Sequence, residues 1–560
     1  MKYDVCIVGS GAGAGPVIYE LANAGFKVLV LEKGPWLKTE HYSKDDMTAT
    51  RRNIYTPSLK DEYHLLETKD DAGNWNAVPT HESKRDFWNG SVVGGSSNFM
   101  SAYFHRLKPK DFRLLSEYGE IENANITDWP ITYDELEPYY AKVESVVGVS
   151  GVVVPHKNLE PRSTPDYPFP PLVVNKIADW FVAAGAKKNY NIIPAARGII
   201  SVPKGDRRAC YLSNYCGSFG CSSDGKGSAR AALINDALKT GNVEIRPDSK
   251  VFHLETNEKN EITKAHYYDL VGRKNSVEAT LFVVAAQAIE TARLLLLSKN
   301  PSCPNGLGNN AGNVGKNLIF SAVATGSGLI EFSDFSAEKI AEINNPMTFV
   351  NRTLLDFYEI DEPESGKKIK GGTIDFLIEH SNPMPKAVRA KKDGDRLVYG
   401  SEFKKNLLNY FTQKKRIRYE AFTDWIPNDD CFVTLAEDHK DKWGDPVAKV
   451  RLGYHDANKI PGEFLSDISK GVFEEVGAKN ISGGISSGPT VNLQAGGCRF
   501  GNDPKNSVLD KNCKSHEVSN LYITDGSFMP TGGSVPFTFT IYANAFRVAE
   551  KIITHLKKQS

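Results

Sequence analysis

The feature that most constrains the fold is a glycine-rich turn near the N-terminus, placed between an apolar segment and a helical pattern. Residues 3–8 are largely apolar and end at Gly9. A helical pattern then covers 17–25, and a second apolar segment, 27–31, ends at Glu32. Strand, turn, helix, strand and acid in this order predict a βαβ unit that binds a dinucleotide.

The turn itself reads Gly9-Ser10-Gly11-Ala12-Gly13-Ala14. Gly9 allows a tight turn, and Gly11 lets backbone N–H groups approach a pyrophosphate at the helix N-terminus. Ala14 replaces the third glycine of the pattern and still permits close packing of helix on strand. Glu32 can accept hydrogen bonds from a ribose diol. A structural turn that binds no phosphate is the alternative interpretation.

Length and charge limit the class of protein. A chain of 560 residues exceeds what one hydrophobic core usually supports, so we expect two domains, or one large domain into which a second is inserted. Hydrophobic residues make up 40% and charged residues 24%, as in ordinary globular proteins. Lys plus Arg equals Asp plus Glu at 68 each, so net charge gives no reason to expect binding to nucleic acid or to an anionic membrane.

The sequence predicts no targeting or membrane-spanning segment. Asp4 interrupts the first apolar run, which argues against a secretory signal. The longest apolar stretch, 281–289, contains Gln287 and is too short to cross a bilayer. We therefore expect a cytoplasmic protein without direct membrane insertion, unless it is exported to the periplasm together with a partner that carries a signal.

Patterns further along the chain predict an α/β fold with an inserted sheet. A polar excursion or lid covers 36–85, and a loop rich in small residues, 87–100, can approach a planar ligand or simply bind nothing. A buried strand and a helix recur over 279–297, as in a Rossmann-like, doubly wound parallel sheet. From about 321 the pattern changes to short alternating strands, which favours an inserted α+β domain with a mainly antiparallel sheet.

These changes of pattern also predict the domain boundaries. The dinucleotide-binding domain should cover 1–320, including the excursion 36–85 and a loop-rich tract at 150–205. The substrate domain should cover 321–465, and 466–560 should return to the first domain.

Six motifs follow one another along nearly the whole chain. The first is the glycine turn together with Glu32, and the others are Gly94-Gly95-Ser96-Ser97-Asn98 and the stretches 285–295, 314–318, 496–501 and 520–527. In this order they resemble the glucose–methanol–choline (GMC) family of FAD oxidoreductases. Asp525-Gly526-Ser527 favours FAD over nicotinamide, which is the alternative for the turn alone. Because Asn98-Phe99-Met100 contains no histidine, the resemblance implies non-covalent FAD.

The resemblance also implies which residues bind FAD. Glu32 would hold the adenosine ribose, Val251 would present its backbone to adenine, and Asp525 with Gly526 would contact the flavin side. The full implied set is Gly9, Gly11, Ala12, Gly13, Ala14, Glu32, Lys33, Gly90, Gly94, Gly95, Ser96, Asn98, Val251, Ala285, Asp525, Gly526 and Thr538.

The catalytic positions depart from the family pattern. The family usually has a histidine five residues before the cysteine that is Cys498 here, but this chain has Leu493. The partner position falls on Val535 or Pro536, so neither side chain can take a proton.

Three polar residues are candidate replacements for the missing pair. Gln494 can orient a hydroxyl but is no base at neutral pH. His380 is a base if it points into the pocket, although a lone histidine is often structural. Asn492 is the third candidate and could equally be a turn residue.

A cysteine cluster raises the question of a second redox group. Cys210, Cys216 and Cys221 resemble the segment that holds an iron–sulfur cluster in bacterial multi-subunit GMC dehydrogenases, where three thiolates suit a [3Fe-4S] type. The spacing differs slightly, and free thiols or one disulfide are the alternatives.

Together these features predict an FAD-dependent dehydrogenase that oxidises a hydroxyl of a sugar, sugar acid or glycoside. Hydride would pass to flavin N5, and electrons would pass to a non-oxygen acceptor through a small subunit or electron-transfer partner. The missing base leaves two alternatives: a non-redox lyase that retains FAD, and a degenerate FAD-binding subunit whose pocket is filled by Leu493, Val535 and Phe537. We also expect Arg106 and Arg293 to pair with carboxylates inside the fold.

Overall fold

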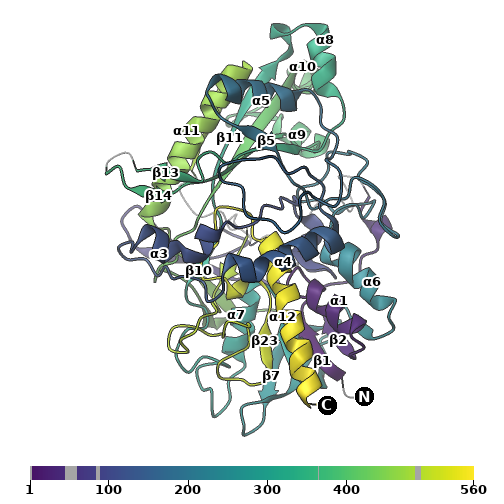
Figure 1. Cartoon of the computed structure of the whole chain (residues 1–560), viewed down its shortest axis with the longest axis vertical. Helices are drawn as coiled ribbons and strands as arrows, with labels where there is room; N and C mark the ends of the chain where they lie inside the picture. Colours follow the sequence, from purple (N-terminus) through teal and green to yellow (C-terminus); the bar gives the residue numbers. More distant parts are fainter. Residues whose placement is uncertain are drawn as a thin grey trace.

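The computed structural model describes residues 3–43, 60–83, 87, 89–362, 365–485 and 493–559. Figure 1 shows an elongated molecule in which α12, β1 and β23 lie in the lower half and α5, α11 and β11 lie in the upper half. Each half is built around its own large sheet. None of the helices in the described ranges is both long enough and apolar enough to cross a lipid bilayer.

The lower sheet contains the predicted βαβ unit. Its strands run in the order β6-β2-β1-β9-β8-β7, and β23 also pairs with β9. The pairs β2–β6, β1–β2, β1–β9 and β9–β23 are parallel, whereas β7–β8 and β8–β9 are antiparallel. The strands are β1 (Tyr3–Val8), β2 (Val28–Leu31), β6 (Val243–Arg246), β7 (Lys250–Thr256), β8 (Ile262–Tyr268), β9 (Lys274–Val284) and β23 (Leu521–Ile523).

Burial explains the apolar runs in this sheet. All four residues of β2 are buried, because helices and loops cover both faces of a parallel sheet. Helix α1 (Gly15–Asn23) follows the glycine turn and contacts α12 (Thr538–Gln559), while α7 (Ala288–Leu297) follows β9. Strand, helix and strand therefore recur as the sequence predicted.

The upper sheet is antiparallel throughout. Its order is β21-β11-β18-β15-β12-β5. The helices α5 (Ile177–Lys187) and α11 (Lys459–Val476) contact each other and pack on this sheet. Its strands are β5 (Ile192–Pro194), β11 (Ala322–Glu331), β12 (Val350–Leu354), β15 (Gly372–Ile378), β18 (Lys414–Thr423) and β21 (Lys479–Ile485). The predicted fold class is thus confirmed, while the exact domain boundaries stay a prediction.

The predicted excursion 36–85 contains regular structure that the sequence did not reveal. Within its described part, β3 (Leu65–Lys69) and β4 (Trp75–Pro79) form a hairpin that extends the β19–β20 pair into a four-stranded sheet. Strand β4 has no buried side chain, so it lacks the apolar alternation by which strands are recognised. Strands β19 (Cys431–Lys440) and β20 (Pro446–Leu452) belong to the distant C-terminal part of the chain.

The remaining elements are short or connect the two halves. The helices are α3 (Leu114–Tyr118), α4 (Tyr133–Val143), α6 (Asn235–Leu238), α8 (Ala337–Asn344), α9 (Pro383–Arg389) and α10 (Gly400–Thr412). The strands are β10 (Leu318–Ile319), β13 (Glu359–Asp361), β14 (Lys368–Lys370), β16 (Lys392–Asp393), β17 (Arg396–Leu397) and β22 (Ala495–Gly496). The 3-10 and π turns are η1 (Thr39–His41), η2 (Gly95–Phe99), η3 (Pro109–Arg113), η4 (Glu144–Gly148), η5 (Arg230–Ile234), η6 (Phe332–Asp334), η7 (Asp456–Asn458) and η8 (Gly526–Phe528).

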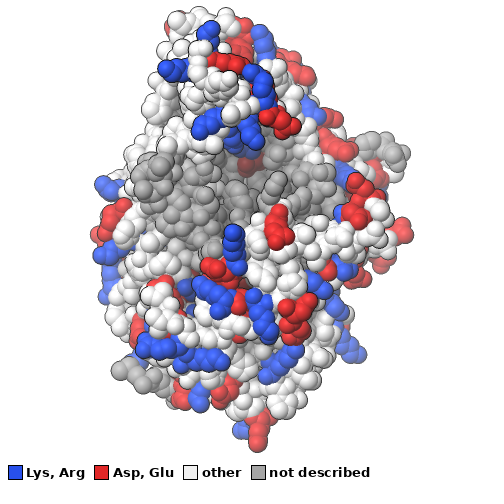
Figure 2. Space-filling view, turned by 180° about the vertical axis from the view of Figure 1, so that it is seen from behind, with Lys and Arg blue, Asp and Glu red and all other residues white. Residues whose placement is uncertain are grey.

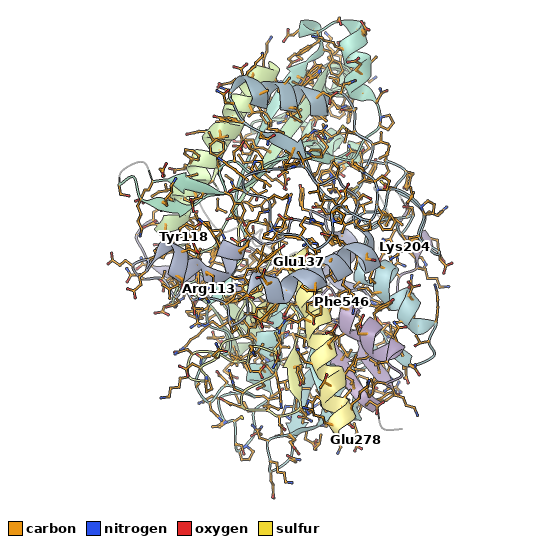
Figure 3. The ribbon with its side chains drawn as sticks, viewed as in Figure 1. Arg113, Tyr118, Glu137, Lys204, Glu278 and Phe546 are labelled. Carbon is orange, nitrogen blue, oxygen red and sulfur yellow. The ribbon has the colours of Figure 1, made fainter. Side chains whose placement is uncertain are left out.

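A buried arginine, Arg106, pairs with carboxylates of α4 and of the turn η4 that follows it. Arg106 donates to Glu137 at 2.8 Å and to Glu144 at 2.9 Å, and its side chain is fully buried. Figure 3 shows Glu137 on α4 close to the helix α12 that carries Phe546, and the two helices are in contact. This confirms the expectation that Arg106 pairs with carboxylates inside the fold.

Replacing Arg106 with methionine should destabilise the protein strongly. The variant leaves the buried Glu137 without its cation and leaves Glu144 with Arg162 alone, so the free energy of unfolding should fall by about 3–5 kcal/mol. Urea unfolding followed by circular dichroism measures the change. Lys239→Met is the matched control, because Lys239 makes two exposed ion pairs and its loss should have a much smaller effect. Equal losses in the two variants would contradict this account of α4.

Candidate cofactor and active site

One cavity of about 700 Å³ connects the lower and upper sheets. At one end it is lined by Val8 and the glycine turn after β1, together with Leu31 at the end of β2. At the other end it is lined by residues of β11 and β18, including Val323 and Phe422. Ligands of doubly wound sheets bind outside the carboxyl ends of the strands, and this cavity lies there.

Glycine is needed at different positions of the first turn for different structural reasons. Gly9 has φ +90°, and a Cβ there would lie 2.4 Å from the carbonyl oxygen of Ala285. A Cβ on Gly13 would lie 2.5 Å from the carbonyl oxygen of Thr524. A Cβ on Gly11, in contrast, would meet no atom of the described chain within 4 Å. Gly9 and Gly13 are therefore required by packing, whereas Gly11 leaves room for a ligand.

Glu32 is buried at the end of β2 and faces the same cavity. Its carboxylate accepts hydrogen bonds from Ser10 Oγ at 2.5 Å and from the backbone N–H of Gly34 at 2.9 Å. Burial raises the pKa of Glu32, while the hydrogen bond from Ser10 lowers it. A carboxylate has about four lone-pair positions, so this group retains acceptors for a ribose diol.

The second loop packs directly against the first. Ser10 Oγ accepts a hydrogen bond from the backbone N–H of Gly94 at 2.9 Å. The Asn98 amide donates at 3.0 Å to the carbonyl oxygens of Val93 and Gly95. Gly94 and Asn98 thus shape the loop from behind, while Gly95 lies on the cavity wall.

Asp525 links two chain segments, 287–291 and 525–527, at the wall of the cavity. Its carboxylate accepts hydrogen bonds from the backbone N–H of Gln287 at 3.0 Å, from Thr291 Oγ1 at 2.5 Å and from the backbone N–H of Ser527 at 2.9 Å. Burial raises the pKa of Asp525. Nearby, the buried Nε2 of Gln287 has no partner among the described residues, so a polar ligand would satisfy it.

Most residues implied as FAD contacts line this cavity. Those on its wall are Gly9, Gly11, Ala12, Gly13, Glu32, Lys33, Gly90, Gly95, Ser96, Val251, Ala285, Asp525, Gly526 and Thr538. Ala14, Gly94 and Asn98 lie behind the wall. The room beside Gly11, the buried Glu32 and the unpaired Gln287 amide together fit a dinucleotide. Contact of the individual residues with FAD stays a prediction.

The expected position of the catalytic base is apolar. Leu493, Pro536 and Phe537 line the cavity, and Val535 is fully buried outside its wall. The cavity is open beside Leu493 and Phe537, whereas the degenerate-subunit alternative expected these side chains to fill it.

The candidate replacements have different surroundings. Gln494 lines the cavity, and its Nε2 donates to the carbonyl oxygen of Phe87 at 2.7 Å. His380 also lines it, with its ring centroid 4.1 Å from that of Phe349. Burial, together with Arg418 and other nearby cations, lowers the pKa of His380 to about 3, so it is neutral and a weak base. Asn492 lies outside the described residues.

Two charged residues of β18, which the sequence analysis missed, face the cavity. Glu420 accepts a hydrogen bond from the Tyr103 hydroxyl at 2.8 Å, and burial raises its pKa. Directly opposite Glu420 in the sheet is the buried Asp375, which lies 3.0 Å from His105 Nε2.

Arg418 lies two residues before Glu420 and also lines the cavity. Its guanidinium group makes no hydrogen bond or ion pair with any residue that the structure describes. The available signal was the run Arg416, Arg418 and Glu420, which puts charge on alternate positions of one strand face.

The three cysteines do not support the predicted iron–sulfur cluster. Among the described residues no group of three or more His, Cys, Asp or Glu side chains could hold a metal ion. Burial and nearby Cys216 raise the pKa of Cys210 to about 11, whereas the pKa of Cys221 is lowered because the Lys226 ammonium outweighs the effect of burial. The Lys226 ammonium lies within the same loop and donates to the carbonyl oxygens of Cys216 and Phe219 at 2.8 and 2.7 Å.

The fold and cavity define the class of protein as an oxidoreductase with a dinucleotide cofactor. Residues 72–323 match the N-terminal model of the GMC oxidoreductase family, and residues 475–545 match its C-terminal model. The chain therefore belongs to the GMC oxidoreductase family and is an oxidoreductase that acts on alcohol-type donors. The cofactor of this family is FAD, which the cavity fits.

Known proteins resemble the chain over nearly its whole length. It is 28% identical to 2-methyl-1,2-propanediol dehydrogenase of Mycolicibacterium austroafricanum, covering 98% of this chain and 95% of the relative. It is 27% identical to the fructose dehydrogenase large subunit of Gluconobacter japonicus, covering 100% and 99%. A formate oxidase from Aspergillus oryzae, whose structure addresses FAD modification, superposes with a TM-score of 0.65 at 13% identity, covering 100% and 99%; this likeness shows the fold.

Replacing Gly11 with alanine should separate cofactor binding from folding. The new methyl group enters the cavity without touching the described chain, so the melting temperature of the apoprotein should not change. The same group should obstruct the pyrophosphate and lower FAD occupancy, measured as the ratio of flavin to protein absorbance.

Gly13→Ala is the contrasting variant, because its methyl group would clash with the backbone of Thr524 and Asp525, directly after β23, and destabilise the apoprotein itself. Undiminished FAD occupancy in the Gly11→Ala variant would contradict placement of the pyrophosphate at this turn.

Proposed function

We propose that the protein is an FAD-dependent dehydrogenase that oxidises a hydroxyl group of a sugar, sugar acid or glycoside and uses a non-oxygen electron acceptor. The observation that carries this proposal is the continuous cavity that joins the dinucleotide turn to the charged face of β18. When bound, FAD supplies the acceptor for the hydride that leaves the carbon bearing the hydroxyl. Non-covalent attachment is part of the proposal, because 98–100 offers no histidine.

Glu420 is the best-supported acceptor for the hydroxyl proton. It is a carboxylate on the cavity wall, and the one hydrogen bond recorded for its side chain within the described structure comes from Tyr103. Its raised pKa makes it a stronger base than an ordinary carboxylate. His380 faces the cavity too, but its lowered pKa leaves it little tendency to bind a proton. Gln494 can orient the hydroxyl without taking the proton.

The cations around the cavity favour a sugar acid within the proposed substrate class. Arg418 is unpaired among the described residues, and Lys386 and Arg389 line the same end. Arg197 is buried nearby, adds a further positive charge, and donates to backbone carbonyl oxygens in its recorded hydrogen bonds. A substrate carboxylate would find a bidentate partner in Arg418.

Likeness to a protein named as a large subunit supports a further part of the proposal. Like that relative, the chain would work with a small subunit or another electron-transfer partner, and such a complex could place it in the periplasm rather than the cytoplasm.

The proposal as a whole is tested by the anaerobic absorbance spectrum of the purified protein, recorded before and after sugars, glycosides and sugar acids are added. Bleaching of the flavin bands by one of them supports it. Bound flavin that no compound bleaches, especially with product formed, would favour a lyase.

Glu420→Gln should slow reduction of the flavin by about 10²–10⁴-fold, because the variant cannot take the hydroxyl proton. Stopped-flow absorbance under anaerobic conditions measures the rate constant. Glu379→Gln is the control, since Glu379 also lines the cavity but already pairs with Lys386 and Tyr410. The assignment of Glu420 is wrong if its variant keeps the wild-type rate or if only a His380→Asn variant loses activity.

Arg418→Gln should raise KM for a sugar acid about 10–100-fold while leaving kcat and the KM of the corresponding neutral sugar little changed. The expected size follows from a charge-assisted hydrogen bond, which contributes about 1.5–3 kcal/mol. Arg389→Gln provides the comparison, because Arg389 lies at the exposed end of the same wall. Equal KM changes for the acid and the neutral sugar would show that Arg418 does not recognise a carboxylate.

A further inference from the structure

The connection between β15 and β18 is a long excursion that contributes little to the core. We call residues 383–413 the basic excursion; it contains α9, the β16–β17 hairpin and α10. Neither α9 nor α10, both fully described, has a buried residue, and all four hairpin residues are exposed. Figure 1 places α10 near the far end of the upper half.

Large apolar side chains are concentrated on the surface of this excursion. Thirteen such side chains are exposed among the described residues, and six of them belong to these 31 residues. Tyr399 is 77% exposed, and Leu408 on α10 is 62% exposed. A cluster of this kind indicates a binding surface, whereas single exposed apolar residues do not. The six are Met384, Val388, Leu397, Tyr399, Leu408 and Phe411.

On α10 the exposed apolar and basic residues share one side of the helix. Phe403, Leu407 and Tyr410 are partly buried and define the face toward the body of the protein. Lys404, Leu408 and Phe411 are exposed, and their spacing of three and four residues places them on one outward face. The helix thus presents apolar groups and ammonium groups together.

The excursion is strongly basic although the whole chain is neutral. It contains seven Lys and Arg residues against three Asp and Glu residues, and 414–416 adds three more cations. Arg396 alone pairs with two of the three acids, Asp393 and Glu402. Five cations of the excursion have no ion pair with any described residue: Arg389, Lys391, Lys392, Lys404 and Lys405. Figure 2 shows basic side chains on the upper half of the molecule, interspersed with acidic ones, and further basic side chains on the lower half.

This combination favours a lipid surface over a protein partner. Protein interfaces are depleted in lysine at their core, because the ammonium group is costly to desolvate. At a membrane surface, lysines remain in the hydrated headgroup layer while aromatic and aliphatic side chains enter the boundary with the acyl chains. Anionic headgroups then attract each basic residue.

We propose that the basic excursion docks the protein on the surface of an anionic lipid bilayer, with the apolar side chains of α9, α10 and the hairpin entering the headgroup region. Asn382, Lys386 and Arg389 line the large cavity at the base of the excursion. Docking would therefore bring this end of the cavity to the lipid surface. The neutral net charge of the whole chain gave no reason to expect membrane binding, because the excess of basic residues in the basic excursion is balanced elsewhere in the chain.

Cosedimentation of the purified, FAD-loaded full chain with vesicles tests the proposal without any activity measurement. We expect binding to vesicles of phosphatidylcholine mixed with phosphatidylglycerol, weak binding to pure phosphatidylcholine, and release at high salt. Replacing Lys404 and Lys405 together by glutamine should weaken binding about thirtyfold, since each lysine near an anionic surface contributes about 1 kcal/mol.

A second pair of double variants identifies the apolar contribution. Leu408→Ser with Phe411→Ser should weaken binding to the mixed vesicles and leave the melting temperature unchanged, because these side chains are exposed. Leu270→Ser with Val271→Ser is the matched control: these residues are 79% and 71% exposed, but they lie at the β8–β9 turn of the lower half. The proposal is overturned if the wild type does not bind mixed vesicles, or if the control pair weakens binding as much as the α10 pair.

Discussion

The structure depends on close backbone packing where β1, β9 and β23 end. Gly9 lies against the chain that follows β9, and Gly13 lies against the chain that follows β23. Asp525 then holds β23, the start of α7 and the turn η8 together through three hydrogen bonds. Because the backbones are this close, the N-terminus of α1 opens directly into the cavity. The same packing therefore stabilises the lower sheet and creates the cofactor site.

The upper sheet supplies charged groups to the part of the cavity where the catalytic base is usually found in this family. Around Leu493, Pro536 and Phe537 the lower half offers an apolar surface. Strand β18 faces the same cavity with Arg418 and Glu420, and Tyr103 holds the carboxylate in place. In the mechanism we propose, the proton acceptor is Glu420 on the β18 side of the cavity, whereas the family usually has its base at the position of Leu493. A dry surface beside the flavin and a charged opposite wall are compatible with that arrangement.

The sequence predicted those parts of the site that are local in the chain. The glycine turn, Glu32 and the 94–98 loop are recognisable because each role depends on a few adjacent residues. The surroundings of His380 were not predictable in this way, since Arg197, Lys226, Lys386 and Arg418 reach it from separate segments.

Contacts between distant parts of the chain also explain the other features that the sequence did not predict. The hairpin β3–β4 joins strands from the far end of the chain. Asp441 lies in a stretch rich in charged residues, yet it is buried between Lys250 and Arg293, which come from distant parts of the chain. The same contact confirms the expected pairing of Arg293. Glu420 belongs to this group too, because its neighbours Tyr103 and Asp375 come from other strands and loops.

The central claim is that a carboxylate on β18 accepts the substrate proton, and the pH dependence of the rate constant for flavin reduction tests it most directly. Burial raises the pKa of Glu420 above its ordinary 4.5, with Asp375 adding to the rise and Arg418, Tyr103 and Arg197 opposing it. The account predicts a rate that increases with pH through one ionisation above pH 4.5. In a Tyr103→Phe variant this ionisation should move to higher pH, since the carboxylate loses a hydrogen bond that stabilises it. A rate independent of pH, or an ionisation that Tyr103→Phe leaves in place, would contradict the account.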